Sequence, residues 1–96
     1  MKLPVKYSPL TPQERRQVRE HYIKLQGGRC YYCQGRLDAP VPSRVSQYPI
    51  DWWRFPGGRE GFLRFPVHLH HNHDTDYTIG AVHSYCNAYL FQYLGE

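Results

Sequence analysis

A helical pattern of apolar residues occupies positions 11–27, and signals for helix boundaries stand at both of its ends. The residues at i, i+4 and i+7 of this pattern are Val18, Tyr22 and Leu25. They form one narrow apolar face. Thr11 is a favourable N-cap residue, Pro12 suits the first helical position, and Glu14 can close a capping box. The glycine pair at 27–28 accepts the left-handed backbone in which helices often end, so we predict a helix over residues 11–27.

Residues 37–61 show no sustained period of either 2 or 3.6 and are rich in proline, glycine and aromatic residues. We expect an irregular loop here, with room for one short strand. Its residues Trp52, Trp53 and Phe55 could pack in a thin core or reach toward a nucleic-acid groove. Core packing is favoured, because aromatic side chains usually bury apolar area first.

The last third of the chain predicts a β-hairpin followed by a helix. Residues 62–71 and 78–83 have the composition of strands, and the polar stretch 74–77 between them suits a turn. The residues that then recur every four positions are Cys86, Leu90 and Leu94. Ser84 is a suitable N-cap and Gly95 a suitable end, so a helix should begin near Ser84. With the first helix, this order predicts an α+β fold.

At 96 residues the chain has the size of a single domain, and we treat residues 1–96 as one. A core of this size gives marginal stability, so a metal or disulfides are often recruited. Three cysteines cannot form a complete disulfide framework, and in a reducing compartment a CxxC pair more often binds zinc or does redox chemistry. The chain has neither a long apolar run nor a secretory leader pattern, so we expect a soluble, cytoplasmic protein.

Lysine and arginine outnumber aspartate and glutamate by 12 to 8, an excess compatible with a polyanionic partner. The arginines within one turn of the predicted helix are Arg15, Arg16 and Arg19. Other basic residues follow along the chain: Lys24, Arg29, Arg36, Arg54, Arg59 and Arg64. The first group could contact nucleic-acid phosphates, but a solvated basic face without a partner has the same pattern, so charge leaves both possibilities open.

Two close pairs of metal-ligating residues stand apart in the sequence. One is Cys30-x-x-Cys33 and the other is His83-x-x-Cys86. Zinc prefers four tetrahedral sulfur and nitrogen ligands, usually supplied as two close pairs by separate turns. The spacing therefore predicts a structural zinc site with three cysteine ligands and one histidine.

Alternatives to this zinc site stay open at this point. The fourth ligand could come from His68 or His73, and the cysteines could simply be small buried residues. A thiol redox protein could also use the Cys30–Cys33 pair. That last hypothesis leaves the segment 68–87 unexplained, although it holds five of the six histidines.

The order CxxC, HLHHNH and HSYCN resembles the HNH (His-Me finger) endonucleases, above all the branch that contains phage recombination endonuclease VII. The resemblance covers residues 28–95. It implies that His70 is a metal ligand, His71 the general base and Asn87 the second metal ligand, with His73 as a further histidine of that branch. The chain departs from the branch in having His70 where aspartate is usual and a histidine for the first ligand of the second zinc pair.

The resemblance implies a small ββα-metal (His-Me finger) domain held together by structural zinc, with the predicted helix added at its N-terminus. It further implies a bacterial or phage-encoded endonuclease that hydrolyses DNA. His71 would take a proton from water, and Mg²⁺ or Mn²⁺ held by His70 and Asn87 would stabilise charge on the phosphate.

So short a chain has little room for a separate recognition domain. We therefore expect low sequence specificity or a partner protein that directs cleavage, and a homodimer is a further possibility. The alternative function is a non-catalytic, zinc-stabilised DNA-binding module, in which His70, His71 and His73 are surface or supporting residues.

Overall fold

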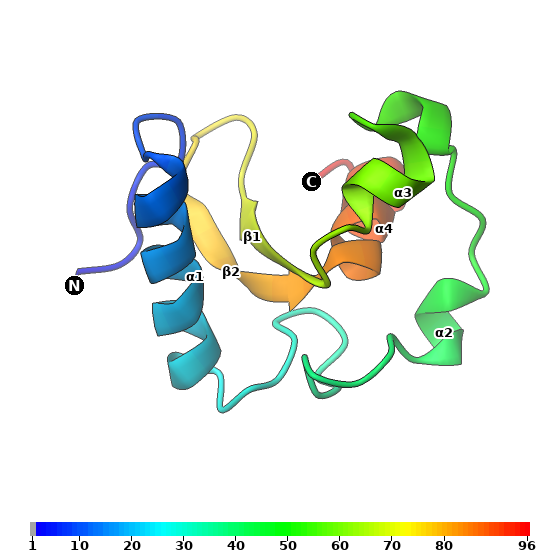
Figure 1. The fold of residues 1–96 in the computed structure, drawn as a ribbon, viewed down its shortest axis with the longest axis horizontal. Helices are drawn as coiled ribbons and strands as arrows, with labels where there is room; N and C mark the ends of the chain where they lie inside the picture. The colour runs from blue at the N-terminus through cyan, green and yellow to red at the C-terminus, as the bar shows by residue number, and fades with distance from the viewer. Residues whose placement is uncertain (1) are drawn as a thin grey trace.

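The computed structural model describes residues 2–96 and contains one two-stranded sheet with helices on both sides of it (Figure 1). The helices are α1 (Pro12–Leu25), α2 (Ser43–Ser46), α3 (Gly58–Phe62) and α4 (Ser84–Leu94), with a 3-10 turn η1 (Trp52–Arg54), and the strands are β1 (Val67–His71) and β2 (Thr78–His83). The hairpin lies between α1 and α4, and α3 lies beside α4 (Figure 1). The predicted α+β class is confirmed.

Helix α1 begins where the capping signals predicted it. The Glu14 backbone N–H donates to Thr11 Oγ1 at 3.1 Å, and the Thr11 N–H donates to Glu14 Oε1 at 2.9 Å, which completes the capping box. The helix ends at Leu25, two residues before the predicted end at 27. Val18 and Tyr22 are buried as predicted, whereas Leu25 is exposed.

The end of α1 is joined to β2 by the side chain of Gln26. Its Oε1 accepts from the Ala81 N–H at 2.9 Å, and its Nε2 donates to the Ala81 carbonyl at 2.9 Å. A Cβ on the neighbouring Gly80 would lie 2.8 Å from Gln26 Oε1 and 3.0 Å from Tyr31, so this close approach requires glycine. The contact brings the turn after α1 against the middle of the hairpin.

Strands β1 and β2 pair in antiparallel fashion, with Leu69 opposite Ala81. The register shifts between His70, which pairs with Gly80, and His71, which pairs with Thr78. Such a bulge bends the strand and changes where the following side chain points. It therefore separates the environments of two adjacent histidines at the end of β1.

Two details of the predicted hairpin are wrong. The first strand begins at Val67 rather than at residue 62, because Phe62 ends α3 and packs against Phe55 and Trp52. The turn is centred earlier than predicted, on 72–76, because the Asn72 carbonyl accepts from the Asp76 N–H at 2.8 Å. The second strand matches its predicted bounds.

The segment 37–61 contains two short helices and the turn η1, so the prediction that it includes a strand is wrong. Its aromatic residues form a second small core on α4. Phe55 is buried with Ile50 and Ala88, and Trp52 packs against this cluster. Core packing is thus confirmed for Trp52 and Phe55 and wrong for Trp53, which is 98% exposed.

Residues before α1 pair with the hairpin turn through an isolated bridge between Lys6 and Tyr77, a feature that was not predicted. The Tyr7 N–H donates to the Asp76 carbonyl at 2.8 Å, and the Thr78 N–H donates to the Val5 carbonyl at 2.8 Å. Ser8 adds bonds from its N–H and hydroxyl to the Asp76 carboxylate at 3.0 and 2.8 Å. This pairing holds Tyr7 next to the end of β1.

Helix α4 begins at Ser84 as predicted, but the N-cap position is occupied by His83 and no side chain caps the helix. Gly95 ends it in the left-handed conformation, with φ of 72°. No helix within residues 2–96 is both long enough and apolar enough to cross a membrane.

Candidate functional site

The four predicted zinc ligands meet in one buried cluster. Cys30 and Cys33 lie in the turn after α1, His83 ends β2, and Cys86 lies in the first turn of α4. Their ligand atoms all lie within 4.8 Å of one another, and all four residues are buried. Three sulfur ligands and one imidazole form a standard tetrahedral zinc set, so this cluster could hold a zinc ion.

The hydrogen bonds of His83 favour metal binding. Its Nε2 lies 2.9 Å from the Arg36 carbonyl and 3.0 Å from the Ala39 carbonyl. Carbonyl oxygens only accept, so Nε2 carries the hydrogen and Nδ1 has the free lone pair. That Nδ1 lies 3.4 Å from Cys33 Sγ and 3.8 Å from Cys86 Sγ. Zinc-binding histidines are commonly held in this way by a backbone carbonyl on the other ring nitrogen.

The thiols of the cluster are coupled through their close packing. A hydrogen bond from Cys86 lowers the pKa of Cys30 to about 4, and the same bond raises the pKa of Cys86. The Gly35 N–H also donates to Cys33 Sγ at 3.4 Å. Burial raises the pKa of Cys33, so without an ion the cluster stabilises one thiolate, that of Cys30. The thiolate is the form of cysteine that binds zinc.

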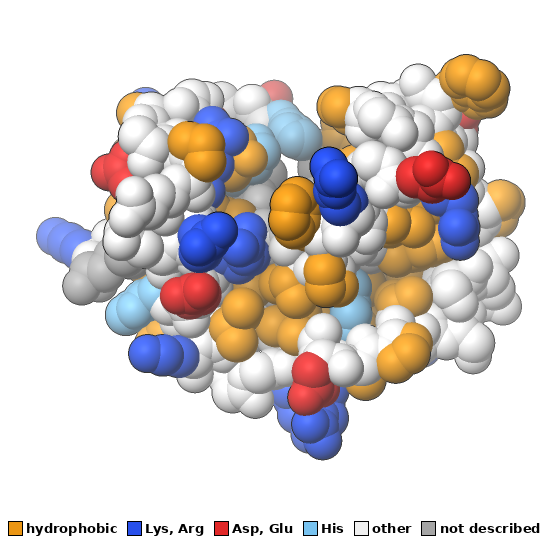
Figure 2. Space-filling model, in the orientation of Figure 1, with side chains coloured by type: hydrophobic (Ala, Val, Ile, Leu, Met, Phe, Trp, Pro, Cys, Tyr) orange, Lys and Arg blue, Asp and Glu red, His pale blue; other side chains and the backbone are white. Residues whose placement is uncertain are grey.

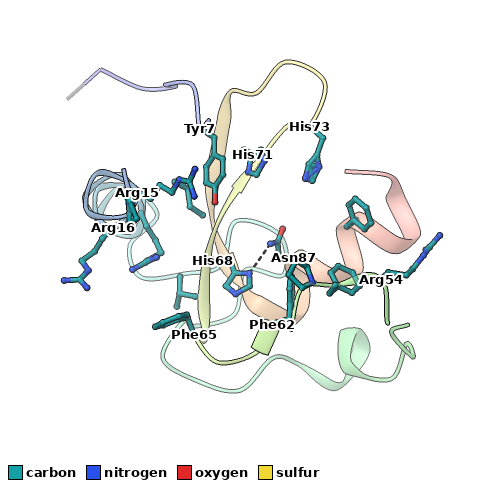
Figure 3. Close-up of a pocket in the computed structure, with 17 residues that line it drawn as sticks. Tyr7, Arg15, Arg16, Arg54, Phe62, Phe65, His68, His71, His73 and Asn87 are labelled. Carbon is teal, nitrogen blue, oxygen red and sulfur yellow. Dashed lines mark hydrogen bonds between the residues drawn. The ribbon is translucent and has the colours of Figure 1, made fainter. Parts of the chain in front are cut away.

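The alternative in which His68 or His73 supplies the fourth zinc ligand is wrong for this structure, because His83 completes the cluster. His68 instead contacts Asn87, and its Nδ1 lies 3.1 Å from Asn87 Nδ2 (Figure 3). His73 lies beyond the end of β1, with its ring centroid 4.7 Å from that of His71. Both histidines therefore belong to a second cluster.

The second cluster is centred on Asn87, in the first turn of α4. Asn87 Oδ1 lies 3.2 Å from His70 Nδ1, and its Nδ2 faces His68. Because the amide nitrogen donates, His68 Nδ1 has a free lone pair in this arrangement. His70 Nδ1 donates to the amide oxygen when it carries the ring hydrogen, and it has a lone pair when that hydrogen is on Nε2. Asn87 follows the zinc-cluster residue Cys86 directly, so the position of one cluster fixes that of the other.

The pair His70 and Asn87 fits a divalent ion by its spacing. Two ligands at right angles on one Mg²⁺ ion lie about 3 Å apart, since each bond is about 2.1 Å. The 3.2 Å between His70 Nδ1 and Asn87 Oδ1 matches that separation. His70 is 1% exposed, and its Nε2 has no hydrogen-bond partner and lies 3.6 Å from Glu96 Oε1. A hydrogen on Nε2 would face this carboxylate and would leave the Nδ1 lone pair beside Asn87 Oδ1, as an ion held by these two atoms requires.

His71 lies past the bulge of β1 and faces a different environment from His70. The ring of Tyr7 stacks on it, with centroids 3.9 Å apart and 8° between the planes. The Arg15 guanidinium lies 4.1 Å from the centroid of the Tyr7 ring, so the three groups form a column. Burial lowers the pKa of His71 below its usual value of 6.5, and the charge of the nearby His73 lowers it further. At pH 7 this imidazole is neutral and able to accept a proton.

A cleft of about 650 Å³ separates α1 from the α3–α4 side of the protein. The predicted basic residues Arg15, Arg16 and Arg19 line it from α1, and Arg54 lines it from η1. Figure 2 shows basic side chains over α1 on one side of this hollow and hydrophobic side chains within it. His71, His73, His68 and Asn87 also line the cleft, as Figure 3 shows.

One residue of the predicted catalytic set lies apart from the cleft wall. His71 and Asn87 line the cleft, whereas His70 does not. His70 is buried and lies next to the cleft residue Asn87. The prediction also missed Tyr7 and the role of His68 as a partner of Asn87. His68 belongs to the histidine-rich HLHHNH motif, but its contact with Asn87 joins β1 to α4 and is not visible in the motif. No motif marks Tyr7, which reaches His71 from the segment before α1.

Comparisons of the chain with protein-family models, with curated proteins and with solved structures give no match. The resemblance to HNH endonucleases therefore rests on the sequence motifs of this chain alone.

Proposed function

We propose that this protein is a metal-dependent endonuclease of the HNH (His-Me finger) type that hydrolyses DNA phosphodiester bonds. The observation that carries the proposal is the placement of His71 and Asn87 on one arginine-lined cleft, with His70 behind Asn87 at 3.2 Å. A buried cluster suited to zinc holds the start of α4, and with it Asn87.

His71 is the proposed general base. It takes a proton from a water molecule, whose oxygen then attacks phosphorus as the bond to the 3′ oxygen breaks. The stacked Tyr7 ring restricts the orientation of the imidazole, and partial burial keeps it neutral. The expected products end in a 5′ phosphate and a 3′ hydroxyl.

His70 and Asn87 are the proposed ligands of a catalytic Mg²⁺ or Mn²⁺. When bound, such an ion supplies a Lewis acid for the charge that develops on the phosphate and the leaving oxygen. The chain contributes the fixed positions of the two ligands. Asn87 is held through Cys86 and the zinc cluster, and His70 is held by its burial within the hairpin.

The arginines of α1 are the proposed phosphate-binding residues. Replacing Arg15, Arg16 and Arg19 with alanine should weaken DNA binding at every sequence and reduce the salt dependence by about one unit of slope for each phosphate that is no longer neutralised. The control variant removes the same charge outside the cleft, at Lys2, Lys24 and Arg64, which are exposed. The affinity for DNA is measured by fluorescence anisotropy over a salt series. If the two variants bind DNA with equal affinity, the α1 arginines form a solvated face and do not bind phosphates.

Tyr7 is the proposed positioning residue for His71. Replacing Tyr7 with leucine should lower kcat by about tenfold and leave KM nearly unchanged, because the stacked ring that orients the base is removed. Tyr7→Phe keeps the ring and should retain the parental kcat. A purely structural role predicts that Tyr7→Leu lowers the melting temperature without this split between kcat and KM, so thermal unfolding is measured on the same samples.

The proposed reaction is tested with an end-labelled DNA oligonucleotide, incubated with zinc-loaded protein and with Mg²⁺, Mn²⁺ or no added divalent ion. Metal-dependent products with 5′ phosphate and 3′ hydroxyl ends support the proposal. Tight binding without cleavage in any metal would contradict it and would instead identify a non-catalytic, zinc-stabilised DNA-binding module.

A further inference from the structure

The wall of the cleft that faces α1 is aromatic, and the proposed hydrolysis uses none of these rings. Phe55, Phe62 and Phe91 line this side, and Phe65 lines the cleft just before β1. Phe91 is 43% exposed and Phe65 is 64% exposed. Single exposed apolar residues are common on protein surfaces, but two of them open into the same basic cleft here.

Phe91 is the ring best placed to meet a ligand held at Asn87. It lies four residues after Asn87 on α4, so both side chains project from the same face of the helix. Its ring packs edge to face with those of His73 and Phe55, with ring centroids 5.4 Å and 5.6 Å apart. These neighbours support the Phe91 side chain and leave part of it open to the cleft.

The charges around the cleft complement a nucleic-acid strand. Arg15, Arg16 and Arg19 on α1 offer cations on one side, and the phenylalanine rings offer apolar faces on the other. A nucleic-acid strand carries its phosphates on one side and its bases on the other. Its phosphates could therefore face the arginines while its bases face the phenylalanine rings. Aromatic rings that stack on bases beside a basic groove are the usual means of binding single strands.

The bases of a paired duplex are already stacked and cannot offer a face to Phe91. A phosphate at Asn87 and His71 would bring its neighbouring base to Phe91 only if that base had left the helical stack.

We propose that the cleft binds DNA in which the base next to the cleaved phosphate is unpaired, with Phe91 as the principal stacking surface and Phe65 as a second one. This inference rests on the proposed endonuclease function and names the form of its substrate. It predicts that a single strand, or a duplex with a short unpaired stretch, binds more tightly than the fully paired duplex of the same sequence.

Binding of the zinc-loaded protein is measured without added Mg²⁺ or Mn²⁺, which prevents metal-dependent cleavage, with labelled single-stranded, fully paired and centrally unpaired DNA. Phe91→Leu keeps an apolar side chain but removes the ring, and it should weaken binding of the two unpaired forms by about fivefold to 100-fold. Phe91→Tyr should bind as the parent does. Phe65→Leu changes a more exposed residue and should show a smaller decrease in affinity for the same two forms.

Trp53→Leu is the matched control, because Trp53 is an aromatic residue with 98% exposure that does not line the cleft. It should leave all three affinities unchanged. Equal decreases in Trp53→Leu and Phe91→Leu, or equal affinity of the parent for paired and unpaired DNA, would overturn the proposed stacking site. Zinc content and melting temperature are measured for each variant to exclude misfolding.

The two proposals fail in different ways. Cleavage in Mg²⁺ or Mn²⁺ without any preference for unpaired DNA overturns the stacking site and leaves the endonuclease function standing. A Phe91-dependent preference for unpaired DNA without cleavage of any form overturns the endonuclease function and supports the stacking site.

Discussion

Replacing His71 with alanine should lower the rate of DNA cleavage by about 10²-fold to 10⁴-fold, which is the usual contribution of a general base. Folding, zinc content and DNA binding should stay close to those of the parent. His71 is only partly buried and its main contact is the stacked ring of Tyr7, so its removal leaves both buried clusters in place. The rate is measured under single-turnover conditions, so that product release does not mask the decrease.

The variants His70→Ala and Asn87→Ala should behave differently from His71→Ala. Both remove a proposed ligand of the catalytic ion, so raising the concentration of Mg²⁺ or Mn²⁺ should restore part of their activity. No metal concentration should restore His71→Ala. If His71→Ala cleaves as well as the parent, the base assignment is wrong, and His73→Ala then decides whether the neighbouring ring at 4.7 Å is the base.

Removing zinc should unfold the protein. We expect one tightly bound zinc ion per chain, and either chelation or Cys33→Ser should abolish the cooperative thermal transition, because metal binding and folding are coupled in small domains. The buried cluster joins the turn after α1 to β2 and α4, and its disruption removes the link between these elements. A domain of this size has about 5 to 10 kcal/mol of stability to lose.

His68→Ala and His73→Ala are the controls for the zinc experiment, since each was an alternative fourth ligand. Both variants should retain one zinc ion per chain, whereas His83→Ala should lose it. Elemental analysis and circular dichroism on the same samples give the two readouts. A well-folded parent without zinc would show that the four residues pack as an ordinary core.

Local signals account for the parts of the fold that could be predicted. The capping box of Thr11 and Glu14 is a short-range interaction and marks the start of α1. The cysteine and histidine pairs could be predicted because zinc demands four ligands of defined type, whatever the surrounding fold. Asn87 was singled out by the resemblance to HNH endonucleases, and it follows Cys86 directly in the sequence.

Long-range contacts account for the parts that could not be predicted. The short helices of residues 43–62 have no amphipathic period of their own. Helix α2 packs through Val45 in the main core, and η1 and α3 pack through Trp52 and Phe62 in the second core on α4. Tyr7 reaches His71 through backbone pairing of segments about 70 residues apart. The bulge that separates His70 from His71 depends on the register of β2, which the residues of β1 do not reveal.

The central claim is most directly tested by the nicking of supercoiled plasmid DNA by zinc-loaded protein. His71→Ala, purified in the same way, controls for contaminating nucleases. We predict that the parent converts supercoiled plasmid to nicked or linear forms with Mg²⁺ or Mn²⁺ and not when both ions are omitted, and that His71→Ala does so at least about 100-fold more slowly. If the parent in both metals cuts neither the plasmid nor single-stranded DNA, or if parent and variant nick equally, the account is contradicted.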